Sequence, residues 1–392
     1  MYRILMVTDL YPPAIGGMER HVQLLVRGLS RTNNEVILCM FGSRQRKLER
    51  QENTRSYSIE GAYQKLPFLY KSQEKSHPPI ADPLLIKRIA EIVKLENPDI
   101  IHCHNWISFS VLRWRRKSRI PLVVSLHDFG FICPQKYSSR YTEGICSDPL
   151  NNKCLTCGRD SYNLAKSMVA YQALRLSRHT LNDADALLYS TPNLLYKMGD
   201  LRPNKFYLPN PIDTDLYRPL NVDSYESRVL CWVKLQRAKG VDTIFRVATL
   251  LPEIFFDVAF VGDDKDCYAC IKPGNVKLIP STKRAEIPRL LNRYPIILGQ
   301  FHIGAIGMAE LEAMSCGRPV VAYWDRKYDS FYDEPCPILS SRNASEIASM
   351  IGNHIGDEKL GMRCREWVIK GHSFTHVTSK LQKIYARTLD SR

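Results

Sequence analysis

The stretch "RILMVTDLYPPAIGGMERHVQLLVRGL" (residues 3–29) decides the fold class of this 392-residue chain. Its first apolar run has the length of one buried strand, and two prolines end it because proline lacks the N–H that a sheet ladder needs. Gly16 and Gly17 then permit a close backbone approach, and apolar residues from Met18 on recur with helical spacing. A strand, a glycine turn and a helix N-terminus suit an anion, since free N–H groups point at the turn. The alternative is an ordinary tight turn of an α/β domain.

The same alternation of short apolar runs and helical patterns continues along the chain. The first series of apolar runs covers residues 3–9, 35–41, 99–105, 121–128 and 183–190, and the second covers 228–234, 255–263, 275–280, 295–301 and 319–324. Strands that alternate with helices form parallel sheets with right-handed crossovers. We therefore predict an α/β fold of two doubly wound Rossmann-like domains that face each other across a cleft.

The predicted domain boundaries follow a connector rich in proline and asparagine at 207–221. We assign residues 1–205 to an N-terminal domain with a cysteine-rich insert at 130–160, and residues 206–372 to a C-terminal domain. A chain of this length exceeds one ordinary core, which supports two domains. The amphipathic tail, 373–392, is predicted to be a helix that crosses back to the N-terminal domain.

Composition places the chain among globular proteins, with 44% hydrophobic and 24% charged residues. The N-terminus reaches Asp9 before the core of a signal peptide could form, and no run approaches the roughly 20 apolar residues of a membrane span. We therefore expect a cytoplasmic protein whose 12 cysteines are reduced thiols or metal ligands.

The net charge of +15 indicates an anionic partner. Its densest clusters are RQRKLERQ (44–51) and RWRRKSR (113–119). Such clusters attract anionic lipid headgroups, phosphorylated substrates or nucleic acid, although many are simply solvated faces. The aromatic interleaving of RNA-binding sheets is missing, so we expect no nucleic-acid partner but a peripheral position on the cytosolic membrane face.

Four cysteines follow the run at 121–128, with the spacing C-x12-C-x7-C-x2-C. They are Cys133, Cys146, Cys154 and Cys157. Four thiolates suit tetrahedral zinc, and a polar loop of this kind needs a staple to become ordered. Unrelated reduced thiols are an equal alternative, and an iron–sulfur cluster fits less well. A structural zinc site is therefore one of two open interpretations.

A second glycine-rich turn lies in "LGQFHIGAIGMAELEAMSCGRPVVAY" (298–323). Gly304 and Gly307 flank the turn after a strand, and the following helix carries Met308 and Glu312. Apolar neighbours place Glu312 near a buried face, where an unpaired carboxylate is costly. It should therefore accept hydrogen bonds, for example from vicinal hydroxyls.

Together these motifs resemble the retaining nucleotide-sugar glycosyltransferases with two Rossmann-like domains, the glycosyltransferase B-type fold of family 4 (glycosyl transferases group 1). The resemblance covers essentially the whole chain. The matching stretches, in order, are ILMVTDLYPPAIGGMERHVQLLVRGL, PDIIHCHN, VVSLHD, LPNPIDTDLYRP, KLQRAKGVD and ELEAMSCGRPVV.

The resemblance implies transfer of a sugar, with retention, from a nucleoside-diphosphate sugar to a glycan or lipid-linked acceptor. UDP-sugars are favoured over GDP-sugars, and no catalytic metal or other cofactor is expected. The N-terminal domain would face the acceptor and the C-terminal domain would bind the donor. By position, Gly16 and Gly17 would approach the diphosphate, and His127 would lie near the transferred sugar. Lys234 and Lys239 would bind phosphate oxygens, and Glu312 would hold the ribose. The residues that would line the donor turn are Gly304, Gly307 and Met308.

Two positions depart from the family pattern. Gly304 stands where the family has a glutamate that contacts the donor sugar, and Lys234 stands where it has an arginine, so the guanidinium fork is lost. Gln300 and His302 are nearby polar candidates, whereas Glu310 lies too near the second glutamate to replace the first. A protein of the same fold that binds sugar nucleotides or glycans without efficient catalysis is therefore the alternative. A nicotinamide-dependent enzyme is disfavoured, because no G-x-G-x-x-G follows the first apolar run.

Overall fold

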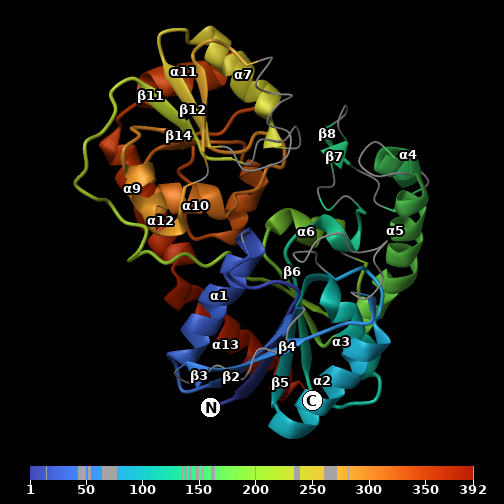
Figure 1. Ribbon diagram of the computed structural model, residues 1–392. Coiled ribbons are helices and arrows are strands. Elements are labelled where there is room, and N and C mark those ends of the chain that lie inside the picture. The colour runs from blue at the N-terminus through green and yellow to red at the C-terminus, as the bar shows by residue number, and fades with distance from the viewer. Residues whose placement is uncertain are drawn as a thin grey trace. The chain divides into compact units, whose positions relative to one another are not determined.

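The structure of the chain is a computed structural model. It describes residues 1–14, 16–42, 50–51, 54–63, 77–134, 136, 139–140, 144–146, 150–151, 153–159, 164–198, 200–233, 239–259, 272–280 and 282–391. The chain divides into two compact units (Figure 1): the first comprises Met1–Ser138, Ser147–Pro211 and Val377–Arg392, and the second Ser139–Cys146 and Ile212–His376. The predicted boundary at 205 falls inside β10 (Asn204–Tyr207), a strand that pairs with the sheet of the first unit.

The first unit is built on an eight-stranded sheet in the order β10-β9-β6-β5-β1-β2-β4-β3. Besides β10, its strands are β1 (Arg3–Thr8), β2 (Glu35–Phe41), β3 (Arg50–Gln51), β4 (Thr54–Ile59), β5 (Ile100–His104), β6 (Leu122–Leu126) and β9 (Ala186–Tyr189). All pairs are parallel except β3 with β4, and the five predicted runs of the first series are confirmed as strands. Because parallel strands end at one edge, the residues after β1, β5 and β6 meet where such sheets bind ligands.

The described helices of the first unit connect these strands (Figure 1). They are α1 (Gly17–Ser30), α2 (Pro83–Glu96), α3 (Ser108–Arg115), α4 (Lys153–Arg159), α5 (Leu164–Ser177) and α6 (Pro192–Lys197), with short 3-10 turns η2 (Asn105–Ile107), η3 (Phe129–Phe131) and η4 (Arg178–Asp183). A separate hairpin, which is grouped with the second unit, pairs β7 (Ser139–Arg140) with β8 (Gly144–Ile145). No described helix combines the length and the apolar character needed to cross a membrane.

The C-terminal helix α13 (Phe374–Asp390) returns to the first unit, as predicted. Its buried side chains join the core formed by α1 and β1, and they are Val377, Leu381, Ile384 and Tyr385. The two helices approach so closely that a Cβ at Gly28 would collide with the hydroxyl of Thr378. Glycine at this position therefore permits the contact.

The second unit has a five-stranded, wholly parallel sheet in the order β13-β12-β11-β14-β15. Its strands are β11 (Arg228–Cys231), β12 (Phe255–Ala259), β13 (Val276–Ile279), β14 (Ile297–Leu298) and β15 (Val320–Val321), which confirms the second predicted series. Its helices are α7 (Val241–Leu250), α9 (Ile287–Asn292), α10 (Met308–Ser315), α11 (Ala344–His354) and α12 (Glu358–His372), with η6 (Arg284–Glu286) and η7 (Arg326–Phe331).

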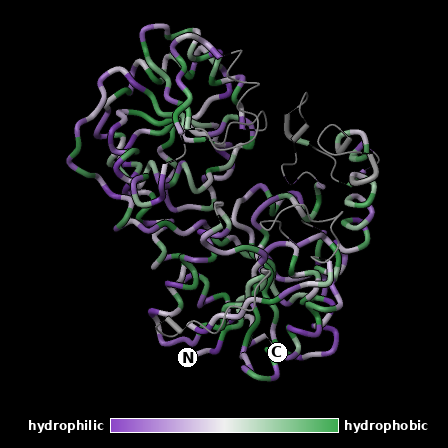
Figure 2. The backbone as a smooth tube through the Cα atoms, viewed as in Figure 1, coloured by the Kyte–Doolittle hydropathy of each residue, from purple (hydrophilic) through white to green (hydrophobic). Residues whose placement is uncertain are grey.

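Helices cover both faces of this second sheet. Successive side chains of a strand point to opposite faces. Accordingly Val229 and Cys231 enter one core with α7 and α11, whereas Leu230 enters another with α10 and α12. Figure 2 shows apolar residues along the strands of each sheet. The doubly wound arrangement is therefore confirmed.

Candidate functional site

The second glycine turn joins β14 to α10 in the second unit. The helix begins at Met308, as predicted, and Gly307 is its N-cap residue. The first N–H groups of a helix have no partner inside it, so they point toward the turn. The predicted helix N-terminus is therefore present beside this loop.

Glu310 fastens both ends of the turn. Its carboxylate is buried, and it accepts a hydrogen bond from the backbone N–H of Gln300 at 3.0 Å and another from that of Gly307 at 3.0 Å. Hydrogen bonds to an ionised acceptor are stronger than neutral ones. Glu310 thus holds the loop from inside and is not directed to a ligand.

Replacing Glu310 with leucine should lower the free energy of unfolding by about 2–4 kcal/mol, because a buried and a partly buried N–H group lose their acceptor. Glu310→Gln keeps one acceptor oxygen, so its free energy of unfolding should fall by less than that of the leucine variant. Urea unfolding of the full chain, followed by tryptophan fluorescence, measures both variants. A leucine variant as stable as wild type would show that the turn does not depend on this carboxylate.

Gln300 is also committed to the turn, which corrects its assignment as a candidate for sugar contact. Its side chain is only 2% exposed. Its Oε1 accepts hydrogen bonds from the N–H groups of His302 and Ile303, and its Nε2 donates to the carbonyls of Ala305 and Tyr323. Every polar atom of the amide is therefore used within the protein. His302 is partly exposed and remains a candidate.

Gly304 occupies a position that an ordinary side chain fits poorly. Its φ is +73°, and a Cβ added there would lie 2.7 Å from Cε1 of Tyr323. The Tyr323 ring stacks against the Arg342 guanidinium, with 3.9 Å from Cζ to the ring centre. A glutamate here would need a left-handed backbone and a displaced tyrosine. The turn is therefore shaped around glycine.

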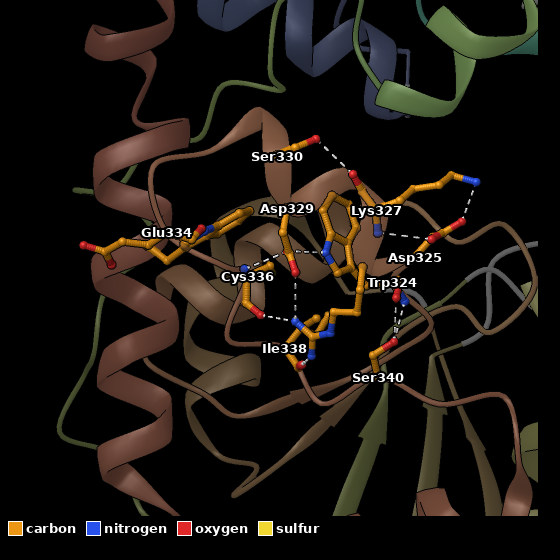
Figure 3. Close-up of polar contacts among 11 residues, drawn as sticks. Trp324, Asp325, Lys327, Asp329, Ser330, Glu334, Cys336, Ile338 and Ser340 are labelled. Carbon is orange, nitrogen blue, oxygen red and sulfur yellow. Dashed lines mark hydrogen bonds and ion pairs between the residues drawn. The ribbon is translucent and has the colours of Figure 1, made fainter.

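The segment that follows β15 supports the turn and has a network of polar contacts of its own, which Figure 3 shows. The backbone N–H of Asp325 donates to the carbonyl of Gly304 at 3.2 Å. Asp329 accepts hydrogen bonds from Nε1 of Trp324 at 2.8 Å and from the N–H of Cys336 at 3.0 Å. A braced segment thus lies directly against the glycine turn.

Lys239 lies next to this turn. Its backbone carbonyl accepts a hydrogen bond from the N–H of Phe301 at 3.0 Å. Gly240 follows with φ of +89°, and a Cβ there would lie 2.9 Å from that of Phe301. The structure therefore brings the loop before α7 and the turn before α10 together. Lys234 lies outside the described residues.

Glu312 lies on α10, as the sequence predicts. It is 7% exposed, and its Oε1 lies 3.8 Å from Nη2 of Arg284, an exposed residue of η6. Met308 packs partly against the core beside it. The second unit thus contains the predicted helix N-terminus, a lysine whose backbone contacts the turn before it, and a nearly buried carboxylate on the same helix.

Polar side chains follow three adjacent strands at the ligand-binding edge of the first unit. Asp9 follows β1, Asn105 follows β5, and Asp128 lies just beyond β6. Oδ1 of Asp9 accepts a hydrogen bond from the backbone N–H of Ile107 at 2.8 Å. Oδ1 of Asp128 accepts one from the backbone N–H of Gly130 at 2.7 Å. Burial raises the pKa of Asp9 to about 7 and also raises the pKa of Asp128. This edge therefore presents carboxyl groups that titrate nearer neutrality than usual.

The first glycine turn opens α1 as predicted, with Gly16 as the N-cap residue. The carboxylate of Glu19 lies against Gly16, where a Cβ would force that side chain to move. Burial raises the pKa of Glu19, and the ammonium of Lys136 opposes that shift. A ligand that reaches the turn therefore meets the carboxylate of Glu19.

His127 belongs to a cluster of four imidazoles, with His21, His102 and His104. Nδ1 of His104 lies 2.8 Å from Nε2 of His127, and the centre of the His21 ring lies 4.5 Å from that of His127. Burial lowers the pKa of His21 to about 4 and that of His102 to about 3, and it lowers the other two pKa values well below 6.5. All four rings are therefore neutral at pH 7.

This cluster was not predicted from the sequence, although part of its signal is visible there. His102 and His104 are two residues apart in one strand, so their side chains point to the same face. The contributions of His21 and His127 come from other elements and need the fold. Sequence reasoning identified His127 alone.

The four cysteines of the insert are each partly exposed. Within the residues that the structure describes, which include these four, no three His, Cys, Asp or Glu side chains are grouped so as to hold a metal ion. Zinc binding stays a prediction, which metal analysis of the purified protein tests.

Comparison with known proteins adds to this geometry. The model of the family described as Glycosyltransferase Family 4 matches residues 15–216. D-inositol 3-phosphate glycosyltransferase 1 of Catenulispora acidiphila is 26% identical over 253 residues, which are 57% of this chain and 55% of that protein. An uncharacterized glycosyltransferase of Methanocaldococcus jannaschii is 23% identical over 342 residues, which are 81% and 80% of the two chains. The matched region thus spans only about half of the inositol-phosphate enzyme.

Solved structures of low sequence identity share the fold. Sucrose-phosphate synthase of Thermosynechococcus elongatus aligns with a TM-score of 0.73 and 15% identity over 100% of both chains. The structure of trehalose-6-phosphate from E. coli, bound with UDP-2-fluoro glucose, aligns with a TM-score of 0.63 and 12% identity over 99% of both chains. At this level of identity the likeness shows the fold alone.

Proposed function

The chain belongs to glycosyltransferase family 4, and from this membership we propose that it transfers a sugar from a nucleoside-diphosphate sugar to a hydroxyl of a lipid-linked glycan or polysaccharide, with retention of the anomeric configuration. One observation carries the proposal: the hydrogen bond from Phe301 to Lys239 joins the lysine loop to the turn before α10. A lysine and a helix N-terminus suit a diphosphate, and a nearly buried carboxylate suits ribose hydroxyls.

In the proposed reaction, the bond between the anomeric carbon and the diphosphate oxygen breaks as the acceptor hydroxyl attacks. Negative charge builds on the leaving diphosphate, and fixed positive groups stabilise it. Lys239 and the N-terminus of α10 supply them, while Glu312 holds the ribose and His127 contacts the sugar. The acceptor hydroxyl attacks on the face that the diphosphate leaves, and the departing phosphate oxygen takes the hydroxyl proton. Among the described residues we identify no side chain as a nucleophile.

A UDP-sugar is the proposed donor, with GDP-sugars second; the E. coli structure of the same fold binds UDP-2-fluoro glucose. Proton NMR of the full-length protein with a panel of UDP-, GDP- and ADP-sugars tests the proposal. We expect diphosphate release from one donor class, with the first-formed sugar in the anomeric configuration of the donor, α for UDP-glucose. First release of the opposite anomer would refute retention.

The alternative function is binding of sugar nucleotides or glycans without efficient catalysis. Gly304 favours it, since the family's glutamate cannot be accommodated there without displacing Tyr323. The same panel separates the two functions. Saturable binding of a donor without any diphosphate release, in the presence of glycan acceptors, would support the alternative.

The basic cluster at 113–119 is proposed to bind an anionic membrane at the cytosolic face. Arg113 and Lys117 are exposed, whereas Arg115 lies 3.3 Å from Asp185 and belongs to the fold. Arg116 is exposed but lies 2.8 Å from Asp183, so Arg113 and Lys117 are the pair chosen for substitution. Arg113→Gln with Lys117→Gln should weaken binding to vesicles containing phosphatidylserine about 30-fold, since each basic residue near the surface contributes about 1 kcal/mol.

Vesicle sedimentation at two salt concentrations measures this effect. The wild type should bind more weakly as salt rises, because the Debye length is about 8 Å at physiological ionic strength. The control, Arg218→Gln with Lys277→Gln, removes the same charge from the second unit. Equal sedimentation of wild type and the Arg113/Lys117 variant would remove the membrane proposal.

A further inference from the structure

The ring of His127 is held from within the first unit by His104. Nδ1 of His104 lies 2.8 Å from Nε2 of His127, and the rings stack with centres 5.1 Å apart at 21°. His104 is fully buried at the end of β5, whereas His127 is partly exposed after β6. An imidazole has two ring nitrogens, so this bond leaves Nδ1 of His127 as the nitrogen that can meet a ligand.

His104 is itself braced from behind. The ring of His102 lies 4.3 Å from that of His104, centre to centre. Both nitrogens of His102 are engaged, Nδ1 with the hydroxyl of Tyr385 at 2.6 Å and Nε2 with that of Ser125 at 2.7 Å. Tyr385 belongs to α13, so the C-terminal helix holds the His102 ring, which in turn packs against His104. The ring of His104 therefore has little freedom to turn.

A second contact fixes the other side of His127. His21 meets its ring edge-on, with centres 4.5 Å apart at 77°, and Nδ1 of His21 lies 2.9 Å from Oδ1 of Asn210. Contacts from α1 and β5 thus determine the plane of the His127 ring. Orientation of a ring by hydrogen bonds to its second nitrogen is how proteins select the working tautomer of a histidine.

Packing alone does not account for a histidine at position 104. Its Nε2 is buried without a hydrogen-bond partner among the described residues. A buried polar atom without a partner destabilises the folded state, and an apolar side chain would avoid that loss. The useful atom of His104 is therefore Nδ1, the atom that engages His127.

We propose that His104 is a positioning residue for the transfer reaction: its bond to Nε2 fixes the His127 ring and makes Nδ1 the nitrogen offered to the sugar. This inference rests on the proposed function, in which His127 contacts the transferred sugar. His104 itself does not touch the substrate. Its effect should therefore fall on kcat and leave KM for the donor little changed.

Three substitutions separate positioning from packing. The amide of asparagine reaches the position of Nδ1 in a histidine, whereas that of glutamine reaches the position of Nε2. For hydrolysis of UDP-glucose, or of the donor that wild type hydrolyses fastest, we expect His104→Gln and His104→Ala to lower kcat about 10- to 100-fold, as misplacement of a reacting group does. His104→Asn should restore kcat to within about threefold of wild type.

The control is His77→Ala, which removes another fully buried imidazole of the same unit. It should lower the melting temperature and leave kcat little changed. Equal kcat for wild type and all three His104 variants would overturn the inference. Equal loss of kcat in all three, in step with melting temperature, would also overturn it, because it would show a role in packing alone.

Nitrogen-15 NMR of histidine-labelled full-length protein tests the same bond without turnover. Wild type should show a single neutral tautomer for His127, and His104→Ala should shift its Nε2 resonance and give a mixture. If wild type releases diphosphate from no donor, even with glycan acceptors present, the proposed transfer fails, whereas this spectrum still tests whether His104 positions the His127 ring. Identical His127 resonances in wild type and His104→Ala would refute it.

Discussion

Glu312→Ala should raise the KM for the donor about 100-fold or more, and transfer at ordinary donor concentrations should become undetectable. A carboxylate that accepts two hydroxyl hydrogen bonds in a nearly buried place contributes about 1.5–3 kcal/mol through each. Glu312 is 7% exposed, and its Oε1 lies 3.8 Å from Nη2 of Arg284. The guanidinium of Arg284 therefore partly neutralises the charge of Glu312 at the long limit of an ion pair. Initial rates over a range of donor concentrations measure the change.

Two variants make this result specific. Glu312→Gln keeps one acceptor oxygen, so its KM for the donor should rise only about tenfold, the effect of losing one hydrogen bond. Glu358→Ala removes an exposed acid from the first turn of another helix of the second unit and should leave transfer unaffected. Wild-type KM in a folded Glu312→Ala protein would contradict the assignment of the ribose to this carboxylate.

Lys239→Ala should lower kcat/KM by about 100- to 1,000-fold, the usual cost of removing one group that stabilises developing charge. The charge on the leaving diphosphate is greatest in the transition state, so kcat should fall as well as kcat/KM. The backbone of Lys239 holds Phe301, and alanine keeps that hydrogen bond. The turn should therefore stay formed, and the loss should report the ammonium group.

Lys239→Arg is the informative partial replacement. It keeps the positive charge but replaces a compact ammonium with a planar fork, so we expect an intermediate rate. Lys277→Ala, which removes an exposed lysine from β13, is the matched control. If Lys239→Ala and Lys277→Ala hydrolysed the donor equally fast, Lys239 could not be the diphosphate ligand.

The sequence predicted the fold wherever a strand is a continuous apolar run. Ten such runs became strands because buried parallel strands are apolar on both faces. β4 was missed because "TRSYSI" is mostly polar and lies in the outer part of its sheet, where one side remains partly exposed. β10 was missed because four residues beside a proline-rich connector carry no clear alternation.

The candidate site was predictable only where function lies in a local motif. Gly307 and Met308 mark the start of α10 within one turn of chain. The anchoring of Gln300 by Glu310 depends on hydrogen bonds across ten residues, and composition cannot indicate it. The bond between His102 and Tyr385 joins residues 283 positions apart. Only the return of α13 to the first unit brings them together.

The central claim is that the second unit binds a nucleoside diphosphate through Lys239 before α7 and Glu312 on α10. Isothermal titration calorimetry of the full-length protein with UDP, GDP and ADP tests it most directly, because it requires neither the correct sugar nor the acceptor. We predict one site per chain, tightest for UDP, with affinity lost in both Lys239→Ala and Glu312→Ala but kept in Lys277→Ala. Equal affinity in wild type and both site variants, or no heat with any of the three nucleotides, would contradict the account.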